Sequence, residues 1–271
     1  MRAVNCAAFA GGTVIGTLGG LIGLGGAEFR LPLLIGVFRF GALEAVIVNK
    51  AVSLVVVAGA LIFRTSSISI GQVTSHWDVI LNVLVGSLAG AWLGAGWATQ
   101  LKSATLYRLI AVLLVGIAVA LVFGHHIGGA PVPLLDGSPL ILSGAVAGLA
   151  IGVIAALMGV AGGELLIPTL VMLFGLDIKL AGSLSLAISL PTMIVGFARY
   201  SCDSSFSVLG RNRAFVGIMA AGSLAGTFIG GMLLGFAPDA VLLPLLAILL
   251  VLSAVKVWRE AAPVRVRNLA S

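Results

Sequence analysis

Gly23-Leu24-Gly25-Gly26-Ala27-Glu28-Phe29-Arg30-Leu31-Pro32 is a stretch that the chain contains twice. The second copy reads Gly159-Val160-Ala161-Gly162-Gly163-Glu164-Leu165-Leu166-Ile167-Pro168. An offset of 136 residues superposes the two copies, and the same offset places residues 86–90 on 222–226, both of which read Gly-Ser-Leu-Ala-Gly. Because one ungapped shift aligns both ends of the chain, the sequence indicates a duplicated protein.

The composition indicates an integral membrane protein. Of the 271 residues, 60% are hydrophobic and 9% are charged, and the mean hydropathy is +1.23. The apolar runs are about 20 residues long, which suits helices that span the hydrocarbon core, and they lack the alternation of an outer-membrane barrel. The formal charge of +6 comes mostly from short loops between these runs. It therefore indicates orientation in the bilayer and no nucleic-acid partner.

Each half contains five apolar segments, of which the second is short. A helix of about ten residues covers only half of the bilayer core, so with the glycines before it we expect a hairpin that enters and returns to the same side. The predicted fold is an all-α membrane protein of two inverted repeats, each made of a broken helix and half-helix hairpin plus three transmembrane helices. The predicted segments are 3–24, 29–38, 42–63, 78–99 and 104–124, and then 139–160, 165–174, 178–199, 214–235 and 240–258. They give repeat 1 at 1–124, an external linker at 125–138, repeat 2 at 139–260 and a cytoplasmic tail at 261–271.

The basic residues support this inverted topology. The loops that it predicts to be cytoplasmic contain eleven Lys and Arg residues, whereas those predicted outside contain Arg64 and Lys179. Such an excess is typical of cytoplasmic loops, so both termini are predicted to be cytoplasmic. The eleven residues are Arg2, Arg39, Lys102, Arg108, Arg199, Arg211, Arg213, Lys256, Arg259, Arg265 and Arg267.

The two glycine motifs, each followed by a short apolar stretch and a helix rich in small polar residues, resemble the sulfite exporter TauE/SafE family of membrane permeases. The resemblance covers nearly the whole chain. It implies transport of sulfite, organosulfonates or related small anions across the bacterial inner membrane. The usual triple glycine departs here to Gly25-Gly26-Ala27 and Ala161-Gly162-Gly163.

Glycines followed by a half-helix are suited to binding an anion. The first amides of a helix lack intrahelical partners, and the helix dipole adds partial positive charge there. Inverted repeats that bring two such ends together are a common transporter construction. The predicted contacts are Gly25, Gly26, Ala27, Gly162 and Gly163, although a purely structural turn is the alternative. Pro32 and Pro168 are expected in or near the first turn, where a missing N–H costs least.

Glu28 and Glu164 are the acids in these motifs, at equivalent positions. An ionisable group at membrane depth is a functional candidate, so we predict coupling or gating roles for both acids and for the two prolines. The alternative for the acids is helix capping.

Three polar residues of the first repeat are predicted to bind substrate: Arg30, Asn49 and Lys50. Lys50 could neutralise an anion or pair with Glu28 or Glu44, and Arg30 could instead extend toward the interface. In the second repeat Ser185 and Ser189 are predicted contacts, since hydroxyls donate to oxyanions. The alternative is that Ser183, Ser185, Ser189 and Thr192 bond their own helix.

The predicted function is a secondary transporter for a small sulfur-containing anion, which binds at the paired half-helix ends near the midplane. The alternatives are an anion channel, or an intramembrane enzyme or membrane subunit of a larger complex. We find no nucleotide-binding loop, catalytic carboxylate pair or metal-ligand cluster, so the sequence predicts no enzyme, cofactor or metal site. The expected partners are the anion and the lipid bilayer, with a second copy of the chain as a candidate.

Overall fold

The computed structural model describes residues 2–22, 26–64, 70–124, 137–233, 248 and 251–259, and a few side chains within these ranges are left undescribed. The described residues are helical apart from turns and short loops, which confirms the predicted all-α class. The helices are α1 (Arg2–Ile22), α2 (Ala27–Gly36), α3 (Ala42–Arg64), α4 (Ile70–Thr74), α5 (Trp77–Gln100), α6 (Ser103–Gly124), α7 (Ser138–Met158), α8 (Gly163–Phe174), α9 (Ile178–Tyr200), η1 (Ser204–Phe206), α10 (Ser207–Arg211) and α11 (Arg213–Leu233).

Five of the described helices are long and apolar enough to cross a membrane. The segments that qualify lie in α3, α5, α7, α9 and α11. Shorter apolar segments occupy α1, α6 and α8. The predicted last segment, 240–258, lies mostly outside the described residues, which show a helix at 251–259.

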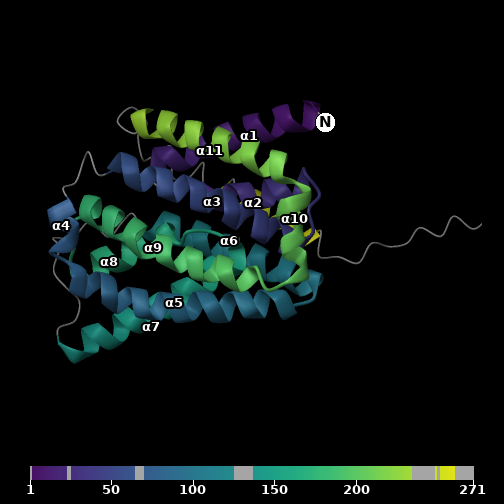
Figure 1. Cartoon of the computed structure of the whole chain (residues 1–271). Helices are drawn as coiled ribbons and strands as arrows, with labels where there is room; N and C mark the ends of the chain where they lie inside the picture. Colours follow the sequence, from purple (N-terminus) through teal and green to yellow (C-terminus); the bar gives the residue numbers. More distant parts are fainter. Residues whose placement is uncertain are drawn as a thin grey trace, which may run out of the picture.

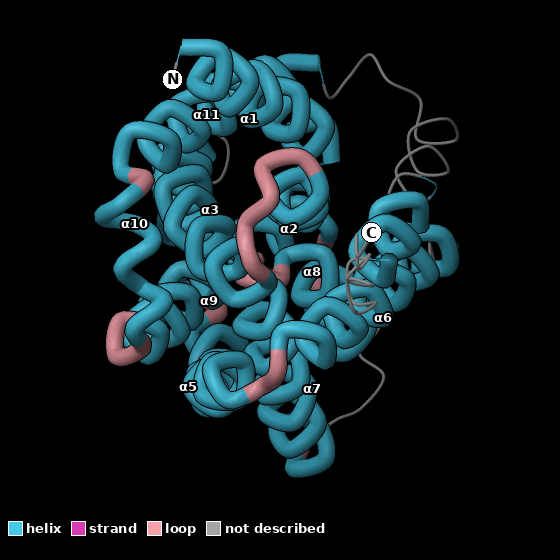
Figure 2. Tube along the Cα trace, turned by 90° about the vertical axis from the view of Figure 1, so that its right-hand side faces the viewer, coloured by secondary structure: helices cyan, strands magenta, loops and turns pink. Residues whose placement is uncertain are grey.

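The two half-helices are as short as the sequence predicts. With ten and twelve residues, α2 and α8 rise about 15 and 18 Å, roughly half of a hydrocarbon core. In Figure 1, α8 lies to the left of α2 along the horizontal long axis of the molecule. Figure 2 shows both near the middle of the molecule, between the α1 and α11 pair on one side and the α5 and α7 pair on the other.

Glycines hold the two outer helix pairs together, and each pair joins helices from different halves of the chain. In both pairs, a side chain at the glycine positions would clash with a backbone carbonyl of the partner helix. These approaches recur at the offset of 136 residues: Gly86 meets Ala145 and Gly222 meets Phe9, while Gly90 meets Leu149 and Gly226 meets Thr13. Small residues therefore let these backbones approach closely, as in other membrane helix pairs.

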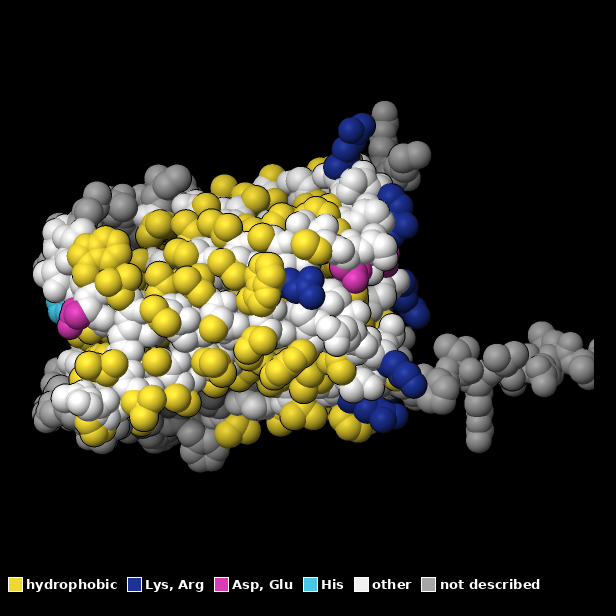
Figure 3. Space-filling view, turned by 60° about the horizontal axis from the view of Figure 1, so that its bottom comes forward, with side chains coloured by type: hydrophobic (Ala, Val, Ile, Leu, Met, Phe, Trp, Pro, Cys, Tyr) yellow, Lys and Arg dark blue, Asp and Glu magenta, His cyan; other side chains and the backbone are white. Residues whose placement is uncertain are grey.

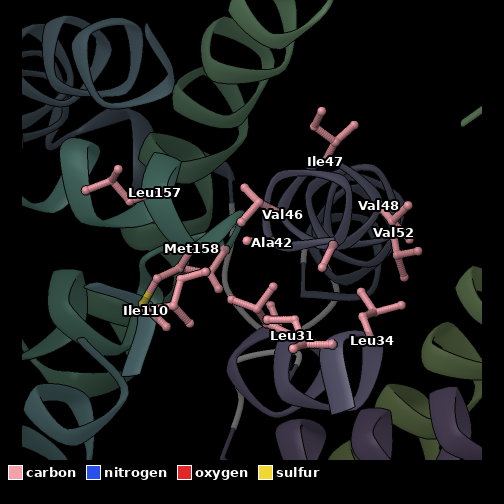
Figure 4. Packing of buried hydrophobic residues seen from close by; sticks show 14 of the residues in the cluster. Leu31, Leu34, Ala42, Val46, Ile47, Val48, Val52, Ile110, Leu157 and Met158 are labelled. Carbon is pink, nitrogen blue, oxygen red and sulfur yellow. The ribbon is translucent and has the colours of Figure 1, made fainter. Parts of the chain in front are cut away.

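The largest apolar core lies around α2 and α3. Leu31 and Leu34 of α2 are fully buried and lie against α3, with Leu34 on the side of Val52 and Leu31 on the side of Val46 (Figure 4). The same cluster includes Met158 at the end of α7. This packing fixes the position of the first half-helix beside the polar residues of α3.

Lys and Arg side chains gather at one end of the molecule. On the face that Figure 3 draws, most of the Lys and Arg side chains lie toward one end, whereas the middle is mainly hydrophobic. This distribution suits a multi-pass membrane protein with short basic loops. The inverted orientation of the two halves in the bilayer stays a prediction.

Candidate functional site

Both half-helices begin at a glycine with left-handed backbone. Gly26 has φ of 70° and Gly162 has φ of 80°, and neither start is capped by a side-chain hydrogen bond. Glycine adopts this conformation without strain, and a Cβ at Gly26 would also strike the carbonyl oxygen of Ile15. Ala27 and Gly163 are the first residues of α2 and α8, while Gly25 lies outside the described residues. The first backbone amides of each helix therefore form the positive end of its helix dipole.

Arg30 is fully buried and is held by three neutral oxygens. Its Nε donates to Asn49 Oδ1 at 2.8 Å and its Nη1 donates to Ser223 Oγ at 3.1 Å. Its Nη2 donates to Ser53 Oγ. The guanidinium thus joins α2, α3 and α11, and it does not extend toward the interface. Hydrogen bonds to neutral oxygens leave its positive charge in place.

Asn49 connects this network to the end of α7. Its Nδ2 donates to the carbonyl oxygens of Ala27 and Met158, at 3.0 and 3.2 Å. Because its Oδ1 accepts from Arg30, both functional groups of the amide are used. Asn49 therefore orients the guanidinium beside the first turn of α2.

Lys50, also fully buried, lies at the carboxyl end of α7. Its Nζ donates to the carbonyl oxygen of Ala155 at 3.4 Å, and a Cβ at Gly196 of α9 would lie 3.1 Å from the same Nζ. The carboxyl end of a helix attracts a cation, which accounts for this position. An ammonium has three N–H groups, so this one long hydrogen bond leaves donor capacity unused. The expected alternatives of pairing with Glu28 or Glu44 are not observed.

The acids near the site have different surroundings. Glu28 is buried in the first turn of α2, and its Oε1 has no hydrogen-bond partner among the described residues. Glu44 forms an ion pair with Arg211, in which Oε1 lies 2.7 Å from Nη2. The side chain of Glu164 lies outside the described part. Among described residues, Arg30 and Lys50 have no carboxylate hydrogen-bonded to them.

The two prolines lie inside their helices. Pro32 and Pro168 are the sixth residues of α2 and α8, just beyond the first turn in or near which they were expected. A proline there cannot donate to the carbonyl four residues earlier. Those carbonyls belong to Glu28 and Glu164, so each motif carries a backbone oxygen that its helix does not satisfy.

The serines of α9 divide into bonded and unbonded hydroxyls. Ser185 Oγ donates to the carbonyl oxygen of Gly182 at 2.8 Å, which is the intrahelical bond that the alternative reading expects. Thr192 Oγ1 bonds Ile188 O and Ser87 Oγ, both at 2.7 Å. Ser189 Oγ is buried without any partner in the described structure.

Sequence reasoning missed residues that complete these networks. It did not assign Ser223, which accepts from Arg30, or Tyr200, whose hydroxyl donates to Ala156 O at 2.9 Å. The duplicated Gly-Ser-Leu-Ala-Gly run contains Ser223 and could have identified it. Nothing in the sequence around Tyr200 indicates its contact with α7.

Two described cavities lie away from these residues. One of about 640 Å³ is lined by Asn5, Phe38, Arg211 and Phe215, among others. Another of about 400 Å³ lies between α6 and the 251–259 helix. Neither is lined by the two buried cations, and within the described residues no three potential metal ligands cluster.

Comparison with known proteins agrees with this architecture. The family model described as "Sulfite exporter TauE/SafE" matches residues 8–257. A protein of Methanocaldococcus jannaschii, described as a probable membrane transporter protein, is 29% identical over 195 residues. That alignment covers 70% of this chain and 69% of the relative. No solved structure matches the chain.

Proposed function

The chain belongs to the sulfite exporter TauE/SafE family of membrane proteins, and from this premise we propose that it is a secondary transporter of a small sulfur-containing oxyanion, such as sulfite or an organosulfonate. Family membership and the relative's description support membrane transport. The chemistry of the buried residues supports the choice of an anion.

The observation that carries the proposal is the pair of fully buried cations, Arg30 and Lys50. A charge inside a membrane protein is costly unless it is paired, and in the described structure neither cation is hydrogen-bonded to a carboxylate. Neither cation therefore has a hydrogen-bonded counter-charge among the described residues. An oxyanion bound here would supply the missing charge.

The two cations contribute in different ways. Arg30 is fixed by Asn49, Ser53 and Ser223, so it supplies a stationary positive charge. Lys50 makes one long hydrogen bond and retains donors that can turn toward the anion. We assign substrate contact mainly to Lys50, and orientation of Arg30 to Asn49.

The half-helices add a second attraction for the anion. The amino ends of α2 and α8 start at Gly26 and Gly162, and in both the first amides carry the positive dipole end. We propose that the two halves are inverted in the inner membrane with cytoplasmic termini, so that these ends meet near the midplane. The central position of α2 and α8 in Figure 2 supports this arrangement.

Glu28 is the proposed carrier of a coupled proton. Its Oε1 is buried without a hydrogen-bond partner in the described structure, and Pro32 has no N–H to donate to the backbone carbonyl of Glu28. A proton on this carboxyl group would offset the charge of a dianionic substrate. Glu164 occupies the equivalent place in the second half.

A transport assay with a panel of anions tests the proposal. Purified protein in liposomes would be given sulfite, sulfate, thiosulfate and methanesulfonate, with protein-free liposomes as the control. We expect saturable uptake of at least one of these anions, and counter-flow of labelled anion when the unlabelled one is present inside. Unsaturable conductance without counter-flow would indicate a channel, and absence of flux for the whole panel would refute the proposal.

A further inference from the structure

The two halves carry different chemistry at equivalent positions of the candidate site. The offset of 136 residues places Leu166 at the position of Arg30 and Leu186 at that of Lys50. The second half therefore lacks both cations. A hydroxyl is retained, because Ser189 is the counterpart of Ser53.

The two equivalent hydroxyls differ in their hydrogen bonds. Ser53 Oγ accepts a hydrogen bond from Arg30, whereas Ser189 Oγ has no partner and its residue is only 1% exposed. Buried hydroxyls are normally hydrogen-bonded, and one that is not requires an explanation. Ser189 also differs from its neighbour Ser185, which bonds its own helix.

Ser189 lies on the face of α9 that meets the start of α8. Residues three and four apart share a helix face, so Leu186, Ser189 and Met193 lie together. Leu186 and Met193 pack in one cluster with Val57 of α3 and with Ala161. Ala161 directly precedes Gly162, which is the residue before the twelve-residue helix α8. Ser189 thus shares the face of α9 whose apolar residues pack against Ala161, two residues before the first residue of α8.

We propose that Ser189 and the first amides of α8 form a second anion subsite, weaker than the one at Lys50 because it has no cation of its own. An oxygen of the bound oxyanion accepts the Ser189 hydroxyl proton. This second subsite presupposes the proposed transport function. With it, the anion would bind in turn at a subsite that contains a cation and at one that contains none.

The two proposed subsites lie at different heights along α9. Gly196, which lies against the Lys50 ammonium, is seven residues from Ser189 along α9, a rise of about 10 Å. Rapid passage requires that binding be strong enough to admit an ion and weak enough to release it. A neutral subsite would bind the anion weakly after it leaves the charged subsite.

The test compares Ser189→Ala with Ser143→Ala in the full-length protein. Ser143 is a matched control because its hydroxyl donates to carbonyls of its own helix, Pro139 at 2.8 Å and Leu140 at 3.0 Å. Sulfite flux would be measured in liposomes, sulfite affinity by calorimetry in detergent, and the unfolding temperature without anion.

For Ser189→Ala we expect about tenfold slower sulfite flux, because a hydroxyl bond to a charged acceptor is lost. The affinity measured at the Lys50 subsite should stay within about twofold of the parent. The unfolding temperature without anion should not fall, since the removed hydroxyl has no partner to lose. Ser189→Thr keeps a hydroxyl and should have the sulfite flux of the parent. Ser143→Ala should also have the sulfite flux of the parent.

Two results would overturn the subsite. One is a Ser189→Ala protein with the flux of the parent, which would leave the hydroxyl bound to water only. The other is a fall in its unfolding temperature that accounts for the lost flux, which would make Ser189 a packing residue. A parent protein that binds and transports none of the panel would instead refute the proposed function itself, and the subsite with it.

Discussion

Replacing Lys50 with methionine tests directly whether the buried ammonium binds the anion. Methionine keeps an unbranched stem of similar length and removes the charge. Within the described residues the ammonium makes one hydrogen bond, of 3.4 Å to Ala155 O, so little is lost from the fold. A buried charge without a hydrogen-bonded carboxylate among the described residues is itself costly, so its removal also relieves a cost of burial. We therefore expect Lys50→Met to fold and to keep its unfolding temperature.

The expected loss is in anion affinity. A hydrogen bond between charged groups contributes about 1.5 to 3 kcal/mol, which corresponds to a roughly 10- to 100-fold weaker Kd. Lys50→Arg should lose less than Lys50→Ala because it keeps the charge, although Gly196 leaves limited room beside the Lys50 head group. Calorimetric titration of the purified protein with the anion that it transports would measure each Kd.

The matched control is Lys102→Met, which removes an exposed lysine at the start of α6. It should leave Kd unchanged, so that a general effect of net charge is separated from a contact at the site. A folded Lys50→Met protein with the Kd of the parent would refute the reasoning. Lys50 would then serve only to stabilise the carboxyl end of α7.

Three further results are expected from the same structure. Gly90→Ala should lower the unfolding temperature by the equivalent of about 1 to 3 kcal/mol, because its Cβ meets the Leu149 carbonyl, while Gly116→Ala, with open space around it, should not. In liposomes, Glu28→Gln should retain anion exchange and lose uphill transport driven by a pH gradient; equal retention of both would leave Glu28 as a helix-capping acid. In a variant without native cysteines, an impermeant thiol reagent added to intact cells should label a cysteine at position 78 and not one at 211, and the reverse pattern would contradict the proposed topology.

The helices and their class could be predicted from the sequence alone. The predicted segment 42–63 corresponds to α3 at Ala42–Arg64, and 178–199 to α9 at Ile178–Tyr200. The length of an apolar run is a local property that the bilayer thickness converts directly into a span. The short second segments could also be predicted, because a helix of ten apolar residues cannot cross the hydrocarbon core of the bilayer.

The duplication predicted which positions are equivalent, but not which helices touch. The structure shows that the glycines of α5 lie against α7, a helix from the other half. The start of α2 was predicted near Gly26, and the structure has its first residue at Ala27 and Pro32 as its sixth. The position of a helix start depends on where the backbone turns at Gly26, which composition does not define.

The candidate site shows the same division between sequence and tertiary structure. Sequence alone identified Arg30 and Lys50 as costly charges at membrane depth, because their position within apolar segments is a local fact. Only the tertiary structure showed that Arg30 is held by residues 19, 23 and 193 positions away, and that Lys50 lies at the end of α7. The physical reason is that burial cost follows from the residue and its segment, whereas a hydrogen-bond partner is set by how helices from both halves pack. A short-range pattern can therefore identify a polar group that must be satisfied, and the fold alone decides what satisfies it.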